Sequence, residues 1–400
     1  MTDERHLDPT PHRELERRWR ILRDVMKEEG LDAILCQSSS NLSGSAGYLR
    51  WMTGYSAMNP YTVVGILPAE EPLVMVRHGA FDGRQVASPE MRAMGFGDVL
   101  TTPSLPAVDY TGGYDASLVK DYLSSIRARR VGILGRAGMY FGFGSELYRL
   151  CSGEIELVDV TDRVDPLKAQ KSEDEIEMIR VAAKMQDDSI AKLAEFIRPG
   201  LTDLEIIAYA QYIGQTLGSE TGFFLGSSFE FGDGSLPLRH RTELGRTVRE
   251  GDLMYLLLEN SGPGGIFTHI GRFFSVGEPP AVLEDTFQDV LETRIFHLGQ
   301  FEMGRECADI FAEYNSYMRE HGYPEEKRLH SHGQGLDVVE RPLIRSDETM
   351  RIMPDLNMGI HPFIFDETKF VTCCDNYLFR SDGTMERLHA APEEIIRVTP

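Results

Sequence analysis

The chain has 400 residues, enough for two domains that each bury a core. Its apolar share of 42% and charged share of 26% are ordinary for a soluble globular protein. The net charge of -22 disfavours nucleic acid and anionic membrane surfaces as partners. Five scattered cysteines make a poor disulfide framework, so we expect a reducing compartment, the cytoplasm. The stretch 1–20 lacks a signal-peptide core, and no apolar run approaches the roughly 20 residues that span a bilayer.

Helical spacing predicts a helix over 11–29 that ends at Gly30. Expected strands and helices then alternate: strands at 32–36, 61–67, 72–76, 130–134 and 155–160, and helices at 117–127 and 144–151. This alternation predicts an α/β domain over residues 1–165. The glycine-rich stretch 135–144 has no phosphate-loop pattern, so we expect a structural or dimerisation role for this half.

A polar joint is expected at 165–171, followed by a second domain over residues 172–400. Ser172 with Glu175, and Thr202 with Glu205, fit capping boxes that open two helices ending near 197 and 217. The remaining elements are expected helices at 281–300 and 305–321 and strand-like stretches at 330–339, 352–365, 372–380 and 385–390. This mixture predicts an α+β domain, which we expect to be the catalytic half.

The stretch 253–277, LMYLLLENSGPGGIFTHIGRFFSVG, predicts a hairpin of two buried strands around a Gly/Pro-rich turn. Glu259 lies in the first strand and His269 in the second. His332 and His361 lie in two further apolar-flanked stretches. A buried carboxylate or imidazole is costly unless it pairs or binds something. These four residues are therefore the candidate chemical centre.

The order of motifs along almost the whole chain resembles the pita-bread family of creatinase, aminopeptidase P, prolidase and methionine aminopeptidase. The matching motifs are KSEDEIEMIRVAAKMQD, VREGDLMYL, GGIFTHIGRFFSVG, SHGQGLDV and MPDLNMGIHPFI. The resemblance implies a C-terminal pita-bread domain preceded by a smaller creatinase-type α/β domain. It also implies a homodimer.

The resemblance also places the metal-ligand positions, and this chain departs from them. The peptidases use two aspartates, one histidine and two glutamates to hold two metal ions. The first aspartate position falls on Leu257, with Glu259 two residues later on the same strand face. The second falls on His269, and the histidine is retained as His332. The glutamate positions fall on His361 and on Cys374 or the following Asp375. A working two-metal peptidase is therefore not expected, because the bridging carboxylates are gone.

Three interpretations of this site remain open. The site is rebuilt for one ion, held by Glu259, His269, His332 and His361 with Cys374 nearby, or it works without metal as creatinase does, or these are satisfied core residues. Imidazole-rich ligation suits iron, zinc or manganese better than magnesium or calcium. The lyase of this fold that cleaves dimethylsulfoniopropionate is similar in placing a ligand two residues after the usual one.

His240 matches the position of creatinase's proton-shuttling histidine, so we expect His240 and His332 to be catalytic. A surface histidine between two arginines is the alternative for His240. Arg272 and Arg341 are candidates to bind a substrate carboxylate, and His330 is a candidate substrate group. Ion pairing inside the protein is the alternative for both arginines.

The function expected from these residues is hydrolysis of a non-peptide C–N bond in a small polar substrate. The alternatives are a lyase that eliminates a leaving group, or a catalytically silent binding protein on the same scaffold. The expected cofactor is one transition-metal ion, or none.

Overall fold

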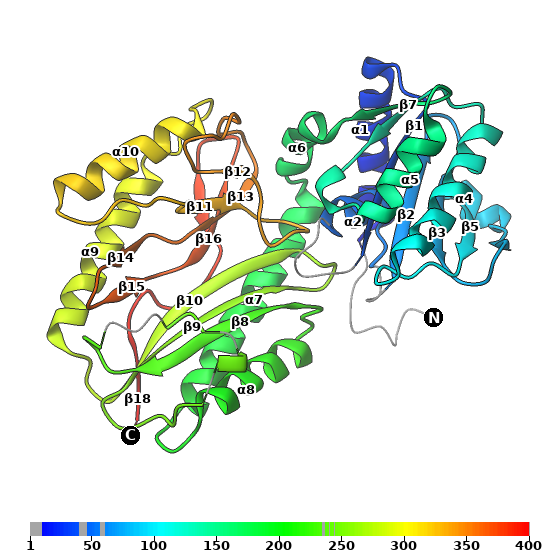
Figure 1. Ribbon diagram of the computed structural model, residues 1–400. Helices are drawn as coiled ribbons and strands as arrows, with labels where there is room; N and C mark the ends of the chain where they lie inside the picture. Colours follow the sequence, from blue (N-terminus) through cyan, green and yellow to red (C-terminus); the bar gives the residue numbers. More distant parts are fainter. Residues whose placement is uncertain are drawn as a thin grey trace. The chain divides into compact units, whose positions relative to one another are not determined.

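The computed structural model describes residues 10–39, 46–56, 61–233, 237–239, 241–243 and 245–399. The chain forms two compact units, Pro9–Lys168 and Ala169–Pro400 (Figure 1). No helix in the described ranges combines the length and apolar character needed to cross a membrane.

The N-terminal unit is built on a mixed seven-stranded sheet in the order β4-β5-β3-β2-β1-β6-β7. Its strands are β1 Ala33–Ser39, β2 Thr62–Pro68, β3 Leu73–His78, β4 Gly83–Gln85, β5 Phe96–Thr102, β6 Arg130–Ile133 and β7 Glu156–Asp159. Its helices are α1 His12–Glu29, α2 Ala46–Thr53, α3 Pro89–Ala93, α4 Gly112–Ser125, α5 Phe141–Cys151 and α6 Thr161–Ala169. The predicted α/β class is confirmed.

Helix α1 shows why the apolar spacing in this segment predicts a helix. Leu15, Trp19, Leu22 and Met26 recur at helical spacing, and all four are buried. Gly30 ends the helix in the left-handed conformation, at φ 65°, which glycine adopts without strain. The predicted helix over 11–29 is confirmed.

The boundary between the two units, at Lys168 and Ala169, falls inside the joint predicted at 165–171, but the first part of that stretch is helical because α6 continues through Ala169. Val164 is fully buried, and the Tyr48 hydroxyl donates to the Asp165 carboxylate. Lys171 follows the helix and forms a buried ion pair with Glu340 at 2.9 Å. Tertiary contacts thus order a segment whose composition resembled a linker.

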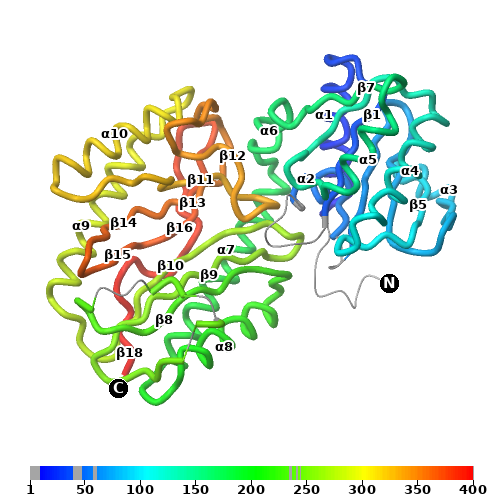
Figure 2. Tube along the Cα trace, viewed as in Figure 1, coloured from blue at the N-terminus to red at the C-terminus, as the bar shows by residue number. Residues whose placement is uncertain are grey.

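The C-terminal unit contains a four-stranded sheet, β18-β10-β9-β8, a five-stranded sheet, β12-β11-β13-β16-β17, and the pair β14-β15. The four-stranded sheet uses β8 Gly222–Phe229, β9 Leu253–Ser261, β10 Phe267–Val276 and β18 Ile396–Val398. The other strands are β11 Ser331–Gly333, β12 Glu340–Leu343, β13 Leu356–Ile360, β14 Phe363–Phe365, β15 Phe370–Thr372, β16 Asp375–Phe379 and β17 Met385–Arg387. A β-bridge between Gly271 and Cys374 joins β10 to the start of β16, and the two strands run close together in Figure 2.

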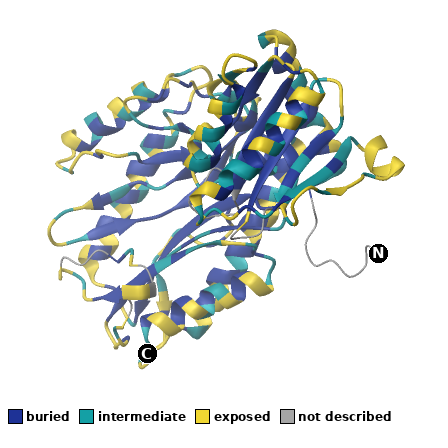
Figure 3. Ribbon diagram, turned by 45° about the vertical axis from the view of Figure 1, so that its right-hand side comes forward, coloured by how far each residue is buried: buried dark blue, intermediate teal, exposed yellow. Residues whose placement is uncertain are grey.

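Four helices cover these sheets: α7 Glu173–Phe196, α8 Asp203–Thr216, α9 Ala281–Leu298 and α10 Cys307–Glu320. Both predicted capping boxes are present, at Ser172/Glu175 and Thr202/Glu205. Helices α7 and α8 pack against one face of the four-stranded sheet. The central strands β9, β10, β13 and β16 are largely buried, whereas short strands such as β17 and β18 are partly exposed and the helices expose one side (Figure 3).

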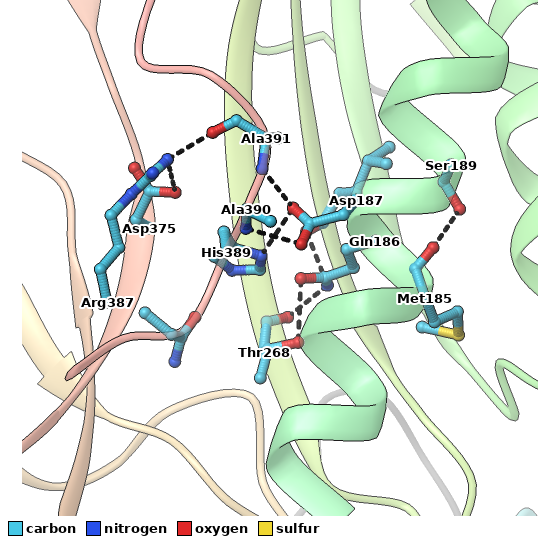
Figure 4. Close-up of polar contacts among 12 residues, drawn as sticks. Met185, Gln186, Asp187, Ser189, Thr268, Asp375, Arg387, His389, Ala390 and Ala391 are labelled. Atoms are coloured by element: carbon cyan, nitrogen blue, oxygen red, sulfur yellow. Dashed lines mark hydrogen bonds and ion pairs between the residues drawn. The ribbon is translucent and has the colours of Figure 1, made fainter.

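Helix α7 is also tied to strand β10 and to the C-terminal segment through polar side chains (Figure 4). Gln186 and Thr268 exchange two hydrogen bonds of 2.8 and 2.9 Å. The Asp187 carboxylate accepts the backbone N–H groups of Ala390 and Ala391 at 2.7 and 3.0 Å. These contacts fix β10, which carries His269, from its helix-covered side.

Candidate metal centre

The predicted hairpin is confirmed, and its register brings two site residues together. Glu259 on β9 stands directly opposite His269 on β10. Gly264 and Gly265 take φ values of 84° and 82° in the turn, which requires glycine-like freedom. Because directly opposed residues share a face of the sheet, the two side chains meet, with His269 Nδ1 3.4 Å from Glu259 Oε1.

Period-two alternation places this pair on the face away from α7 and α8. Met254, Leu256 and Leu258 of β9 join the core beneath those helices. Leu257 and Glu259 alternate with them and line a pocket on the opposite face. Leu257, at the position where the resemblance to the peptidases places an aspartate, therefore presents an apolar side chain to the pocket.

The second sheet supplies the other two histidines. His332 lies on β11 and pairs in register with Gly359 of β13, just before His361. The ring centroids of His269, His332 and His361 lie 5.2 to 5.5 Å from one another. Donor atoms of Glu259, His269 and His332 all lie within 4.8 Å of one another. Four residues spread over more than 100 positions of sequence thus converge.

Burial and neighbouring charges set the protonation of these groups. Burial, followed by the charge of His269, lowers the pKa of His332 to about 4. Burial and the charges of His332 and His269 place the pKa of His361 well below its ordinary value. Burial raises the pKa of Glu259, but its interactions with His269, His332 and Gln334 outweigh burial and lower it. Neutral imidazoles beside a carboxylate are the forms that bind metal.

Two further observations fit a metal ion at this place. The Nε2 atom of His269 is buried and has no hydrogen-bond partner among the described residues. His332 Nδ1 lies 3.0 Å from the Gly333 carbonyl, which orients the ring so that Nε2 remains available. Glu259, His269 and His332, whose donor atoms are close together, would hold the ion. His361, whose ring centroid lies 5.2 Å from that of His332, would complete a set of three imidazoles and one carboxylate, which suits iron, zinc or manganese.

A chain of buried amides holds the carboxylate and β10 in place. Gln334 Nε2 donates to Glu259 Oε1 at 2.9 Å, and Gln334 Oε1 accepts from Asn376 Nδ2 at 2.9 Å. Asn376 Oδ1 in turn accepts the backbone N–H of His269 at 2.7 Å. Gln334 and Asn376 were not singled out in the sequence, although Gln334 lies inside the motif SHGQGLDV.

The donor group opens into a pocket of about 480 Å³ with a largely apolar wall. Its lining residues are Leu225, Leu238, Tyr255, Leu257, Glu259, His269, Glu326, Arg328, Leu329, His332, Val339, His361, Phe363, Phe365, Phe370, Thr372 and Cys374. The sequence gives no signal for Glu326 and Arg328, because their segment, PEEKRLH, has the composition of a solvated loop.

Cys374 lies on the pocket wall and outside the close donor group. Its sulfur is 3.1 Å from the Tyr255 hydroxyl and 3.7 Å from the Thr372 hydroxyl. Burial raises the pKa of this thiol to about 12, so it is protonated. The geometry therefore gives no support to the prediction that Cys374 is a ligand.

The prediction that Arg272 binds substrate is wrong. Its guanidinium is fully buried and donates to Asp375 and to the carbonyl oxygens of Pro392 and Cys374. No donor of this side chain faces the pocket. Arg272 therefore connects the two sheets of the unit.

His330 and Arg341 also lie outside the pocket lining, which corrects both predictions. His330 is fully buried, stacked on Tyr314 at 3.9 Å, with Nδ1 3.1 Å from His297 Nε2. Arg341 pairs with Glu348 at 2.5 Å. His240 lies outside the described residues, so its catalytic role stays a prediction.

Known proteins that are similar to this chain agree with the fold described above. Residues 177–384 match the model of metallopeptidase family M24. The chain belongs to this family. Its members use divalent metal ions, and the donor group described above is a possible site for one.

Relatives of this M24 chain carry the names of peptidases. A Bacillus subtilis protein named as an uncharacterized peptidase, YqhT, is 23% identical and covers 94% of this chain and 98% of its own. An Xaa-Pro dipeptidase of Pyrococcus furiosus is 24% identical over 55% of this chain and 63% of its own. An Xaa-Pro dipeptidase structure from Bacillus anthracis has a TM-score of 0.76 at 20% identity, covering 96% of this chain and all of its own. The pita-bread fold is therefore confirmed, and the family is one of enzymes named as peptidases.

Proposed function

We propose that the chain is a metal-dependent hydrolase with a single-ion centre that cleaves a non-peptide C–N bond in a small polar substrate. One observation supports the proposal most: Glu259 is the single carboxylate in the close donor group, and the group is otherwise imidazole. Two ions side by side need bridging carboxylates to offset their mutual repulsion.

The rest of the pocket supplies no second set of acidic ligands. Glu326 is the other carboxylate among the described lining residues. Asp375, close in sequence, is fully buried against Arg272 and Arg294 and is not available for an ion. The family's peptidase chemistry is therefore not assigned to this chain in our proposal.

The residues around the proposed ion have distinct roles. Glu259 and the three histidines would hold the ion, while Gln334 orients the Glu259 carboxylate. The apolar wall limits water and strengthens polar interactions inside the pocket. An ion held there would polarise the substrate and activate water. His240 is the proposed proton carrier.

Metal analysis of the purified protein tests the single-ion centre. We expect one equivalent of iron, zinc or manganese per chain, lost in His361→Ala and retained in His321→Ala, a matched change of an exposed histidine. Two equivalents would contradict the proposal. A metal-free protein whose activity is abolished by His240→Ala would favour creatinase-like chemistry instead.

Activity assays test the bond that is cleaved. We expect a panel of small amidines and ureido acids to be hydrolysed, with oxygen from labelled water entering the product. An unsaturated product without label would identify a lyase. Robust cleavage of Xaa-Pro dipeptides would overturn the non-peptidase assignment, and no turnover of either panel would favour a silent binding protein.

A further inference from the structure

The segment between α10 and β11 brings two opposite charges to the pocket wall. Glu326 and Arg328 both line the pocket, together with Glu259, His332 and His361. They are two residues apart, and the intervening Lys327 is exposed and does not line the pocket. The described residues contain no ion pair between Glu326 and Arg328.

Glu326 is held firmly in this position. Asn315 of α10 clamps its backbone, donating to the Glu326 carbonyl at 2.9 Å and accepting its N–H at 2.8 Å. Glu326 Oε1 accepts the backbone N–H of Arg328 at 2.5 Å. The residue is 8% exposed, and its second oxygen, Oε2, is buried with no hydrogen-bond partner among the described residues. A buried acceptor of this kind is costly until a donor reaches it.

Arg328 offers the complementary group. Its side chain is exposed, and no ion pair or hydrogen bond of its guanidinium occurs within the part of the chain that the structure describes. It lines the same pocket as His332 and His361, the two histidines of the second sheet. By contrast, Arg272 and Arg294 of the same unit are buried and paired.

The remaining wall is apolar. Leu225 of β8, Leu257 of β9, and Phe363 and Phe370 of the β14–β15 pair face the same cavity. An apolar wall with a few convergent polar groups is the usual form of a small-molecule site, in which the polar groups fix orientation.

We propose that this pocket selects a small N-substituted amino acid, whose carboxylate binds Arg328 and whose N–H donates to Glu326 Oε2. The substituent on nitrogen lies against the leucine and phenylalanine side chains. The two charged residues, which lie two positions apart in the chain and line the same pocket, are the specificity residues for the carboxylate and the adjacent nitrogen. The inference rests on the proposed function in taking this pocket as the substrate site.

Three matched probes separate the two contacts. N-benzylglycine carries the carboxylate and the N–H, 4-phenylbutanoate replaces the nitrogen by carbon, and N-benzylglycinamide removes the negative charge. N-benzylglycine and 4-phenylbutanoate have no hydrolysable bond, and an ammonia assay checks that the carboxamide of N-benzylglycinamide stays intact, so calorimetric titration of the purified full-length protein measures binding alone. We expect N-benzylglycine to bind most tightly, by about tenfold over either analogue, as for a charge-assisted contact.

Two substitutions assign each contact to its residue. Arg328→Gln is expected to weaken the binding of N-benzylglycine and of 4-phenylbutanoate about tenfold and to leave the affinity for N-benzylglycinamide unchanged. Glu326→Gln keeps an acceptor for the backbone N–H of Arg328. It is expected to weaken the binding of the two nitrogen-containing probes but not that of 4-phenylbutanoate. The unaffected probe in each case shows that the variant is folded. Lys327→Gln, the same charge change one residue away, is expected to alter none of the three.

Equal affinities for the three probes, or no binding of N-benzylglycine, would overturn the inference. An equal effect of Lys327→Gln and Arg328→Gln would also overturn it, because that result indicates a diffuse field and no direct contact. Metal content is measured separately, so a failed single-ion centre with intact probe selectivity would be told apart from a failed specificity assignment.

Discussion

Arg272 on β10 donates from Nη2 to Oδ1 of Asp375 on β16 across 2.7 Å, and both side chains are fully buried. Arg294 of α9 pairs with the other carboxylate oxygen at 2.9 Å, and Arg387 of β17 approaches Oδ1 at 3.2 Å. Burial alone would raise the pKa of Asp375, but these arginines and His389 lower it far below its ordinary value. One ionised carboxylate thus connects two sheets and a helix behind the pocket.

Removing that charge should destabilise the C-terminal unit strongly. Asp375→Asn leaves the buried guanidinium of Arg272 without its counter-ion, which costs about 3–5 kcal/mol in comparable cases, whereas Arg294 and Arg387 keep Glu393 as a partner. Urea denaturation measures the change in the free energy of unfolding. Asp285→Asn, at an exposed position on α9, is the matched control and should change it by less than about 0.5 kcal/mol. A loss below about 1 kcal/mol for Asp375→Asn would contradict the interpretation.

Asp187 makes the stability of the protein depend on pH. Burial raises its pKa, but His389 and the backbone N–H groups of Ala390 and Ala391 outweigh burial and lower it (Figure 4). A carboxyl group whose pKa is lower in the folded protein than in the unfolded chain stabilises the fold at pH values above the pKa of the unfolded chain, about 3.9. This stabilisation is lost as the pH falls through the pKa of the folded protein. The stability gap between the wild type and Asp187→Asn should therefore be largest near neutral pH and shrink in acid.

Thermal unfolding over a pH series measures that gap. Asp188→Asn, the exposed neighbour on the same helix, should give a small gap with little pH dependence. A gap for Asp187→Asn that stays constant from neutral pH into acid would show that the hydrogen bonds, and not the charge, provide the stabilisation.

Much of the candidate site could be predicted because it follows local rules. Alternation along the 253–277 hairpin placed Leu257 and Glu259 on one face, and register then set Glu259 opposite His269. The capping boxes at Ser172 and Thr202 were equally local. In the N-terminal unit, β5 was missed because FGDVLTT mixes polar and apolar residues without a clear period.

The errors concern charges whose partners are distant in sequence. The sequence leaves Arg272 open between a substrate ligand and an internal ion pair, because its partner Asp375 lies 103 residues later and nothing local indicates the pairing. Glu326 has no signal in the sequence, because it lies in a run of charged residues. A run of charged residues usually marks a solvated loop, whereas Asn315, eleven residues earlier, holds the backbone of Glu326 at the pocket wall.

Gly359 should be essential to the geometry of the donor group. A Cβ at this position would lie 2.4 Å from Cε1 of His269, so any side chain forces the imidazole to move. We expect Gly359→Ala to lower the metal content of the purified protein and to cost about 1–3 kcal/mol of stability. Gly245→Ala, where no atom lies within 4 Å of the new methyl group, should change neither. Full metal content in Gly359→Ala would show that His269 is not a ligand.

The last prediction concerns Gln334, which donates to Glu259 Oε1 at 2.9 Å while its own oxygen accepts from Asn376. Groups that orient a ligand in this way typically contribute about 10–100-fold to metal affinity. Gln334→Ala should therefore weaken metal binding by that factor, measured by competition with a chromophoric chelator, while far-ultraviolet circular dichroism stays unchanged. Gln288→Ala, on the exposed side of α9, is the control and should bind metal as the wild type does. Wild-type affinity in Gln334→Ala would mean that Glu259 needs no orientation or does not hold the ion, and the second possibility is tested directly by Glu259→Gln.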